Sequence, residues 1–232
     1  MRILLVGHGR MGRLVSALAP EYGCEIAGII DSRSATGPDG PASPRWNEVE
    51  VAIDFSSSSA VAGNVSALAR RGINIVVGTT GWQKDEPTVR AAVEEAQVGI
   101  VAAPNFSTGV AILEAVVGRA AALLAGRADF GAWVHEAHHA AKKDAPSGTA
   151  LLLKRTMEQA GYSRPVDISS TRAGHIPGSH TVGFDGPAET IALSHVARDR
   201  STFARGALEA ARWVKGKRGW FTMRDVLELE RT

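Results

Sequence analysis

The sequence predicts an α/β protein in which a doubly wound parallel-sheet domain is joined to a smaller α+β domain. Over the first hundred residues short β-rich runs alternate with Ala-rich segments of helical periodicity, a pattern typical of βαβ crossovers. A glycine-rich turn follows the first of these runs. After about Asn105 the alternation gives way to grouped strands beside helices, which indicates the second domain.

The first domain is predicted to hold five parallel strands. They are the runs Ile3 to Val6, Glu25 to Ile30, Val49 to Phe55, Ile73 to Val77 and Val98 to Ala102. Helices are expected between most of them, at Met11 to Ala19, Ser59 to Arg71 and Asp85 to Ala96. Between the second and third strands, Ser32 to Pro44 is rich in Gly, Pro and Ser, so a loop replaces the crossover helix there.

The second domain is predicted to span residues 106–203. Its expected helices are Val110 to Leu124 and Gly148 to Ala160, and its expected strands are Phe130 to His135, Val166 to Arg172, His180 to Phe184 and Thr190 to His195. The tail then returns to helical periodicity at Phe203 to Val214, and its last segment, Met223 to Leu229, ends in the short amphipathic run Asp225 to Leu229. We expect residues 204–232 to complete the first domain, which begins with residues 1–105.

Composition excludes several classes of function. With 44% hydrophobic residues the chain can bury a core, and its formal net charge of +2 comes without the basic runs that nucleic-acid binding requires. The single cysteine, Cys24, stands in an apolar setting and is expected to be a buried thiol. The N-terminal apolar run is too short for a signal peptide, and no apolar stretch could span a membrane, so a cytoplasmic protein is expected.

A glycine loop follows the first predicted strand and opens the first helix. Its sequence, Gly7-His8-Gly9-Arg10-Met11-Gly12, matches the GxGxxG pattern of Rossmann-type domains, in which the backbone approaches a pyrophosphate at the helix N-terminus. Asp31, nineteen residues after Gly12, ends the second strand, where an acid binds a ribose hydroxyl. Arg10 and Arg33 could instead meet a 2′-phosphate. The loop therefore predicts NADH or NADPH without deciding between them.

Two further turns follow later strands of the same sheet. They are Gly78-Thr79-Thr80-Gly81 and Ala103-Pro104-Asn105-Phe106-Ser107. Ligands of doubly wound sheets bind at the carboxyl ends of the strands, so both turns are candidates for a cofactor site. Ordinary small-residue turns would look the same, and the residues alone favour neither interpretation.

Titratable residues gather in the stretch EAHHAAKKDAPSGTA, Glu136 to Ala150. With the preceding residue, His135, Glu136 and His139 also match HExxH, the zinc-protease helix pattern. That alternative is disfavoured because Phe130 to Val134 is typical of a strand and the glycine loop would have no use. No obvious third ligand stands out downstream, although His175, His180 and His195 are candidates. We therefore expect no metal.

The favoured interpretation rests on cation density. His138, His139, Lys142 and Lys143 precede Pro146-Ser147-Gly148-Thr149, where free backbone N–H groups and the dipole of the next helix favour an anion. A carboxylate would fit there, although a solvated basic loop is the alternative. Together with the glycine loop, the cluster predicts a nicotinamide-dependent reductase of a small acidic substrate.

The run from Glu136 to His139 followed by Lys142-Lys143-Asp144-Ala145-Pro146-Ser147-Gly148-Thr149-Ala150 resembles the signature of the 4-hydroxy-tetrahydrodipicolinate reductase (dihydrodipicolinate reductase) family of the diaminopimelate route to lysine. The resemblance extends over nearly the whole chain. It includes Asp54-Phe55-Ser56, both later turns, His195, and Arg200 to Ala207. The glycine loop is one residue shorter than the GxxGxxG of many members, and the loop at 32–47 is abbreviated.

The resemblance implies reduction of a cyclic dicarboxylate by hydride from NADH or NADPH, in a homotetramer. It implies proton-handling roles for His138 and Lys142, with Lys142 as the donor to the carbon next to the hydride acceptor. The residues implied in substrate binding are His139, Ser147, Gly148 and Thr149. Those implied at the cofactor site are Gly7, His8, Gly9, Arg10, Met11, Gly12, Asp31, Arg33, Gly78, Thr79, Thr80, Ala103, Pro104, Asn105 and Phe106.

Two other functions compete with this one. A different two-domain dehydrogenase of an amino or keto acid would not be expected to carry the run from Lys142 to Thr149. A non-catalytic dinucleotide sensor would have no use for a proton donor such as Lys142 or His138.

Overall fold

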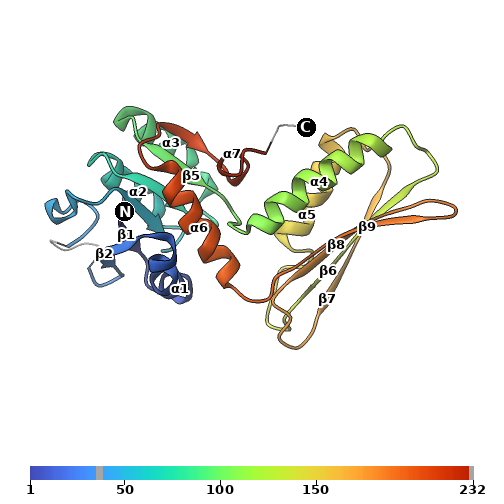
Figure 1. The fold of residues 1–232 in the computed structure, drawn as a ribbon, viewed down its shortest axis with the longest axis horizontal. Coiled ribbons are helices and arrows are strands. Elements are labelled where there is room, and N and C mark those ends of the chain that lie inside the picture. Colours follow the sequence, from blue (N-terminus) through green and yellow to red (C-terminus); the bar gives the residue numbers. More distant parts are fainter. Residues whose placement is uncertain (35–38, 230–232) are drawn as a thin grey trace. The chain divides into compact units, whose positions relative to one another are not determined.

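The computed structural model describes residues 1–34 and 39–229, which form two compact units (Figure 1). The first unit is built from Met1–Ser107 and Ser201–Glu228, and the second from Thr108–Arg200. The chain returns to the first unit at Ser201 and stays in it to Glu228, whereas Leu229 is grouped with the second unit. Within the described residues, none of the helices combines the length and the hydropathy that crossing a bilayer requires.

The first unit contains a six-stranded sheet in which every strand pair is parallel. In spatial order its strands are β10 (Gly219–Phe221), β5 (Gly99–Ala102), β4 (Asn74–Val77), β3 (Val51–Asp54), β1 (Arg2–Val6) and β2 (Glu25–Ile30). The five predicted strands are confirmed. The sixth, β10, was not predicted, since three residues are too few to give a periodic signal.

Helices cover both faces of this sheet because its side chains alternate between them. Leu4, Ala52 and Ile75 join a core that includes residues of α2 (Val61–Ala69) and α3 (Glu86–Ala96). Their equally buried neighbours, among them Leu5 and Ile53, point to the opposite face. The helix α6 (Ser201–Val214) contacts β3, β4 and β5 and packs against α1 (Arg10–Leu18). The short helix α7 (Met223–Val226) follows β10.

The connection after β2 contains no helical crossover among its described residues. It holds a single 3₁₀ turn, Pro44–Trp46, whose tryptophan is buried in the core. Gly28 on β2 makes room for that ring, since a Cβ there would lie 2.3 Å from it. The part of the predicted loop at 35–38 lies outside the described residues. Cys24 is buried, as expected, and burial raises the pKa of its thiol.

The second unit is a four-stranded mixed sheet with two helices on one face (Figure 1). The strand order is β7 (Val166–Arg172), β6 (Gly131–His138), β8 (Ser179–Asp185) and β9 (Thr190–Val196). The helices α4 (Thr108–Leu124) and α5 (Gly148–Gln159) pack together and bury alternate residues of the strands, such as Val134, Val182 and Phe184. The predicted α+β unit is confirmed.

The strand β6 is longer than predicted, and this decides where the titratable residues lie. It continues through Glu136 to His138, whereas the sequence pattern placed its end at His135. Pairing sets Glu136 beside His180 on β8, and His180 beside His195 on β9. These three side chains therefore lie in one row across the face of the sheet that α5 covers.

Candidate active site

The predicted cofactor residues gather at one edge of the first sheet. All its strands run in the same direction, so the segments that follow β1, β2, β3, β4 and β5 emerge at the same side. These segments contain the glycine loop, Asp31, Phe55 with Ser56, Gly78 to Thr80, and Ala103 to Phe106. The strand order reverses between β1 and β3, the place where doubly wound sheets bind their ligands.

The glycine loop is packed so closely that two of its positions require glycine. A Cβ on Gly7, which has φ +92°, would lie 2.3 Å from the carbonyl oxygen of Phe55. A Cβ on Gly12 would lie 2.1 Å from the carbonyl oxygen of Gly7. At Gly9, the N-cap of α1, there is open space and no side-chain cap on the helix N–H groups. His8 and Arg10 beside it are exposed, and Met11 is half-buried. This cradle fits a pyrophosphate.

A carboxylate ends β2 where a ribose would lie. Asp31 Oδ1 accepts hydrogen bonds from the backbone N–H groups of Arg33 at 2.9 Å and Ser34 at 3.2 Å, and these bonds lower the pKa of Asp31. The guanidinium of Arg33 is 3.4 Å from Oδ2, but its side chain is 91% exposed. Asp31 is thus fixed and ionised, while Arg33 is free to turn toward a phosphate.

A buried carboxylate ties the loops after β3 and β4 together. Asp54 Oδ1 accepts from the backbone N–H of Ser56 at 2.9 Å and from the hydroxyl of Thr79 at 2.9 Å, and Oδ2 accepts from Asn64 at 2.9 Å. Phe55 fills the space beside Gly78, where a Cβ would lie 2.1 Å from its ring. Thr79 is therefore held in place by its hydroxyl, and Thr80 beside it is exposed.

The turn after β5 is anchored by an aromatic contact. Phe106 is buried and meets Phe55 edge to face, with ring centroids 6.3 Å apart. Asn105 Oδ1 accepts the backbone N–H of Ser107 at 2.8 Å. Ala103 is buried and Pro104 is exposed. Of the predicted cofactor residues in this turn, Ala103 and Phe106 are thus buried and support it, whereas Pro104 faces outward.

In the second unit the predicted catalytic residues are organised by a carboxylate with no exposed surface, Glu136. Its Oε1 accepts from Arg172 Nη2 at 2.7 Å and from the backbone N–H of Ser147 at 3.2 Å. Its Oε2 accepts from Arg172 Nη1 at 3.0 Å and from His138 Nδ1. Burial alone would raise the pKa of Glu136, but hydrogen bonds from Arg172, Ser170 and His138 outweigh it and bring that pKa to about 2. Glu136 is ionised at neutral pH.

His138, at the end of β6, lies between this carboxylate and two cations. Burial lowers the pKa of His138, Glu136 works against that effect, and the charges of Lys142 and Arg172 add to it. The imidazole is consequently neutral at pH 7. Its ring meets that of His180 edge to face, with ring centroids 5.1 Å apart.

The predicted anion site is the first turn of α5. Ser147 is its N-cap, and the hydroxyl accepts the backbone N–H of Ala150 at 3.2 Å. The same hydroxyl lies 3.1 Å from Nε2 of the buried His180. Burial and the nearby His138 lower the pKa of His180 to about 4, so it is neutral at pH 7. Gly148 is exposed and Thr149 half-buried at the start of the helix.

The lysines differ in their surroundings. Lys142 Nζ donates to both carboxylate oxygens of Asp144 at 2.7 Å, and its side chain is 24% exposed. Lys143, the next residue, is exposed. His139 is half-buried just beyond the end of β6. The structure thus brings together His138, Lys142 and the start of α5 around Glu136 and Arg172.

The zinc-helix alternative does not hold, because His135 and Glu136 lie on a strand and point to opposite faces of the sheet. His135 Nδ1 lies 2.9 Å from Ser169 Oγ on the face away from α5. Glu136, His138 and His180 do bring ligand atoms within 4.8 Å of one another. Both oxygens of Glu136 are already occupied by Arg172, however, so this trio suits a hydrogen-bond network better than an ion.

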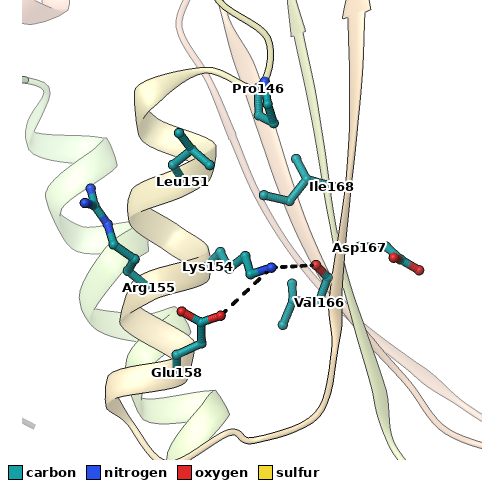
Figure 2. A pocket seen from close by; sticks show the side chains of 8 residues that line it. All are labelled: Pro146, Leu151, Lys154, Arg155, Glu158, Val166, Asp167 and Ile168. Carbon is teal, nitrogen blue, oxygen red and sulfur yellow. Dashed lines mark hydrogen bonds and ion pairs between the residues drawn. The ribbon is translucent and has the colours of Figure 1, made fainter.

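A separate surface groove of about 500 Å³ runs between α5 and the edge strand β7 (Figure 2). Lys154 crosses it, with Nζ 3.5 Å from the carbonyl oxygen of Val166 and 3.9 Å from Glu158. Of the run Pro146 to Thr149, which was predicted to bind an anion, only Pro146 lines this groove.

Sequence reasoning missed that four residues hold the predicted site residues in place through hydrogen bonds: Glu136, Asp144, Arg172 and His180. Arg172 and His180 follow Glu136 by more than thirty residues, and only the pairing of β6 with β7 and β8 brings them to it. Asp144 lies within the recognised run and could have been identified by its charge beside Lys142.

Two family models match almost the whole chain. The model described as dihydrodipicolinate reductase, N-terminus, matches residues 1–106, and that described as dihydrodipicolinate reductase, C-terminus, matches residues 109–227. Among curated relatives, the 4-hydroxy-tetrahydrodipicolinate reductase of Methanoregula boonei is 39% identical, covering 100% of this chain and 99% of its own. That of Christiangramia forsetii is 32% identical, covering 98% of both chains.

Solved structures share the fold. A dipicolinate-bound dihydrodipicolinate reductase from Paenisporosarcina sp. TG-14 superposes with a TM-score of 0.80 at 19% identity, covering 96% of this chain and 97% of its own. A DAP dehydrogenase of C. glutamicum in complex with DAP gives a TM-score of 0.55 at 15% identity, covering 100% of this chain and 96% of its own.

Proposed function

The chain belongs to the dihydrodipicolinate reductase family, and from that premise we propose that it reduces 4-hydroxy-tetrahydrodipicolinate to tetrahydrodipicolinate with NADH or NADPH. The observation that carries the proposal is the cluster built on Glu136, in which a neutral histidine and a lysine lie beside the start of α5. That arrangement suits a substrate that must be held as an anion and protonated. The dipicolinate bound to the solved relative is a dicarboxylate of the same kind.

The substrate's carboxylates are assigned to the N-terminal turn of α5 and the cations around it. Backbone N–H groups at Gly148 and Thr149 and the dipole of this twelve-residue helix favour negative charge, and His139 adds a donor. Arg172 neutralises Glu136, so a dianion meets no uncompensated negative charge from the buried carboxylate.

In the overall reaction the hydroxyl leaves as water together with a proton from the neighbouring ring carbon, and the ring then gains a hydride on the first of these carbons and a proton on the second. The nicotinamide supplies the hydride when bound. The proton is assigned to the ammonium of Lys142, which Asp144 holds in place. His138 is assigned to restore that ammonium, by taking a proton from solvent on Nε2 and passing it to Lys142. The glycine cradle, Asp31 and the turns after β4 and β5 are assigned to hold the coenzyme.

Self-association is assigned to the face of the second sheet that neither α4 nor α5 covers. Trp133, His135 and Thr181 lie on it, with Ser194 and the 63% exposed Val196 on β9. A tetramer is expected from the family resemblance, and we expect the protein to be cytoplasmic, like other enzymes of biosynthesis. Light scattering of wild type and Trp133→Arg checks the assembly, since charge on this face should lower the mass of the particle.

The activity is tested by supplying the product of dihydrodipicolinate synthase together with NADH or NADPH. Steady oxidation of the coenzyme, dependent on that product, supports the proposal. Another amino-acid dehydrogenase would instead oxidise coenzyme with a keto acid and ammonia, and a sensor would bind coenzyme without turnover.

A further inference from the structure

Glu136 is saturated with hydrogen bonds. A carboxylate without exposed surface is costly to ionise, and Arg172 offsets that cost by a bidentate pair, with Nη2 to Oε1 at 2.7 Å and Nη1 to Oε2 at 3.0 Å. Arg172 itself is fixed by donating to the carbonyl oxygens of Thr171 at 2.8 Å and Asp144 at 2.5 Å. The pair is therefore a rigid, neutral unit beneath His138.

The state of Glu136 dictates which nitrogen of His138 carries the proton. An ionised carboxylate accepts hydrogen bonds and cannot donate, so the neutral imidazole must place its hydrogen on Nδ1, toward Glu136 Oε2. Nε2 is then left with a lone pair. A Cβ on Gly178, whose φ is +144°, would lie 3.1 Å from this Nε2, so glycine there keeps the approach to that nitrogen open.

The same carboxylate reaches the anion site. Its Oε1 accepts the backbone N–H of Ser147, the N-cap of α5. One side chain thus links the ring orientation of His138 to the position of the helix start.

We propose that Glu136 and Arg172 are positioning residues of the reaction. Glu136 fixes His138 as the Nδ1–H tautomer with Nε2 turned toward the substrate, and Arg172 cancels the charge of Glu136 so that a dicarboxylate can bind beside it. This inference rests on the proposed function for the identity of the substrate, but the tautomer is a property of the protein alone.

The charged groups that face His138 predict in which direction its pKa should move when each of them is removed. They are Glu136 on its own strand, Arg172 on β7, His180 on β8, and Lys142 in the turn before α5. Glu136 raises the pKa of His138, whereas Arg172 and Lys142 lower it. Removing the charge of Glu136 should therefore make His138 harder to protonate. Removing Arg172 should let the pair of Glu136 and His138 take up its proton at higher pH.

The experiment is a ¹⁵N-NMR titration of the histidine side chains in the full chain, with the His138 signals identified by their loss in His138→Gln. In wild type we expect Nδ1 protonated and Nε2 unprotonated at pH 7.5. Glu136→Gln should shift the titration of His138 to lower pH and mix the tautomers, and Arg172→Gln should shift it to higher pH. Tyr162→Phe is the matched control, because it removes a buried hydrogen bond to Phe130 in the same unit, of 2.8 Å, without touching the site.

Kinetics of the same variants separate the two roles. Glu136→Gln should lower kcat by about 10- to 100-fold, as loss of an orienting partner commonly does. Arg172→Gln should act mainly on KM for the dicarboxylate. Tyr162→Phe should reduce thermal stability and leave the pH profile of kcat/KM unchanged.

Two results would overturn the inference. The first is a wild-type His138 protonated on Nε2, which needs no variant to fold. The second is a shift of the His138 titration in the same direction in both variants, as general loosening would produce. Failure of the proposed function looks different, since the tautomer would be as expected while no coenzyme is oxidised.

Discussion

The ammonium of Lys142 lies 2.7 Å from each carboxylate oxygen of Asp144, two residues further along the chain. The pair is partly exposed, so its contribution to stability is small. Its effect is to hold the ammonium of Lys142, the proton donor that we propose, in one place next to His138 and the start of α5.

Lys142→Ala should lower kcat by about 10²- to 10⁴-fold, the usual contribution of a positioned acid. Coenzyme binding should stay near normal, because the predicted coenzyme residues belong to the other unit. Steady-state kinetics at saturating coenzyme measure the effect. If Lys142 only attracts the dicarboxylate, KM rises instead and kcat is largely kept.

Lys143→Ala is the control, since this lysine is exposed and adjacent. It should retain nearly full activity. A crippled Lys143→Ala beside an active Lys142→Ala would refute the assignment of residues while leaving the family untouched.

The position of Asp31 predicts use of both coenzymes, with NADH at least as good as NADPH. Its fixed carboxylate should bind a free ribose hydroxyl and repel a 2′-phosphate, which Arg33 partly offsets. Asp31→Ser should raise the ratio of kcat/KM for NADPH to that for NADH, and Arg33→Ala should lower it. A hundredfold wild-type preference for NADPH would mean that Asp31 points away from the ribose.

Two glycines of the loop should differ in what they affect. Gly12→Ala forces a Cβ to within 2.1 Å of a backbone oxygen, so stability should fall by about 1–3 kcal/mol. Gly9→Ala meets nothing within 4 Å and should leave the melting temperature nearly unchanged, but the added methyl should weaken coenzyme binding. Calorimetric melting and coenzyme titration distinguish the two. Unaltered coenzyme affinity in Gly9→Ala would remove this loop from the coenzyme site.

The buried His180 predicts a loss of stability in mild acid. Its folded-state pKa of about 4 is below its ordinary value of 6.5, so the unfolded chain binds the proton more tightly. Its contribution to the free energy of unfolding is constant above pH 6.5 and falls toward pH 4, by on the order of 3 kcal/mol in total. Urea unfolding at pH 7 and pH 4.5 should show the stabilities of wild type and His180→Gln converging in acid. Parallel pH dependences would show that the pKa of His180 is the same in the folded and the unfolded chain.

The fold was largely predictable because its signals are local. Buried parallel strands such as Ile73 to Val77 are continuous apolar runs, and the Gly7 to Gly12 loop marks the first crossover. The end of β6 was not predictable in the same way. Glu136 and His138 are polar residues on a buried face, and they fit a strand only because Arg172 and Ser147 satisfy the carboxylate.

The sequence predicts which residues form the site, but it does not predict the hydrogen bonds that connect them. The run from His138 to Thr149 contains the donors and the helix start, and these can be recognised because they are neighbours in the sequence. The partners that set their protonation, Arg172 and His180, come from strands whose register depends on the packing of the whole sheet.

The most direct test of the account follows the hydrogen atoms. The product of dihydrodipicolinate synthase is incubated with the protein and with NADH or NADPH deuterated at the transferring position, and the product is examined by mass spectrometry. We predict one deuterium from the coenzyme on a ring carbon in water, and a second, solvent-derived deuterium on the neighbouring carbon in D₂O that is acquired far more slowly in Lys142→Ala. Absence of the coenzyme's deuterium from the product, with the coenzyme oxidised or not, would contradict the account.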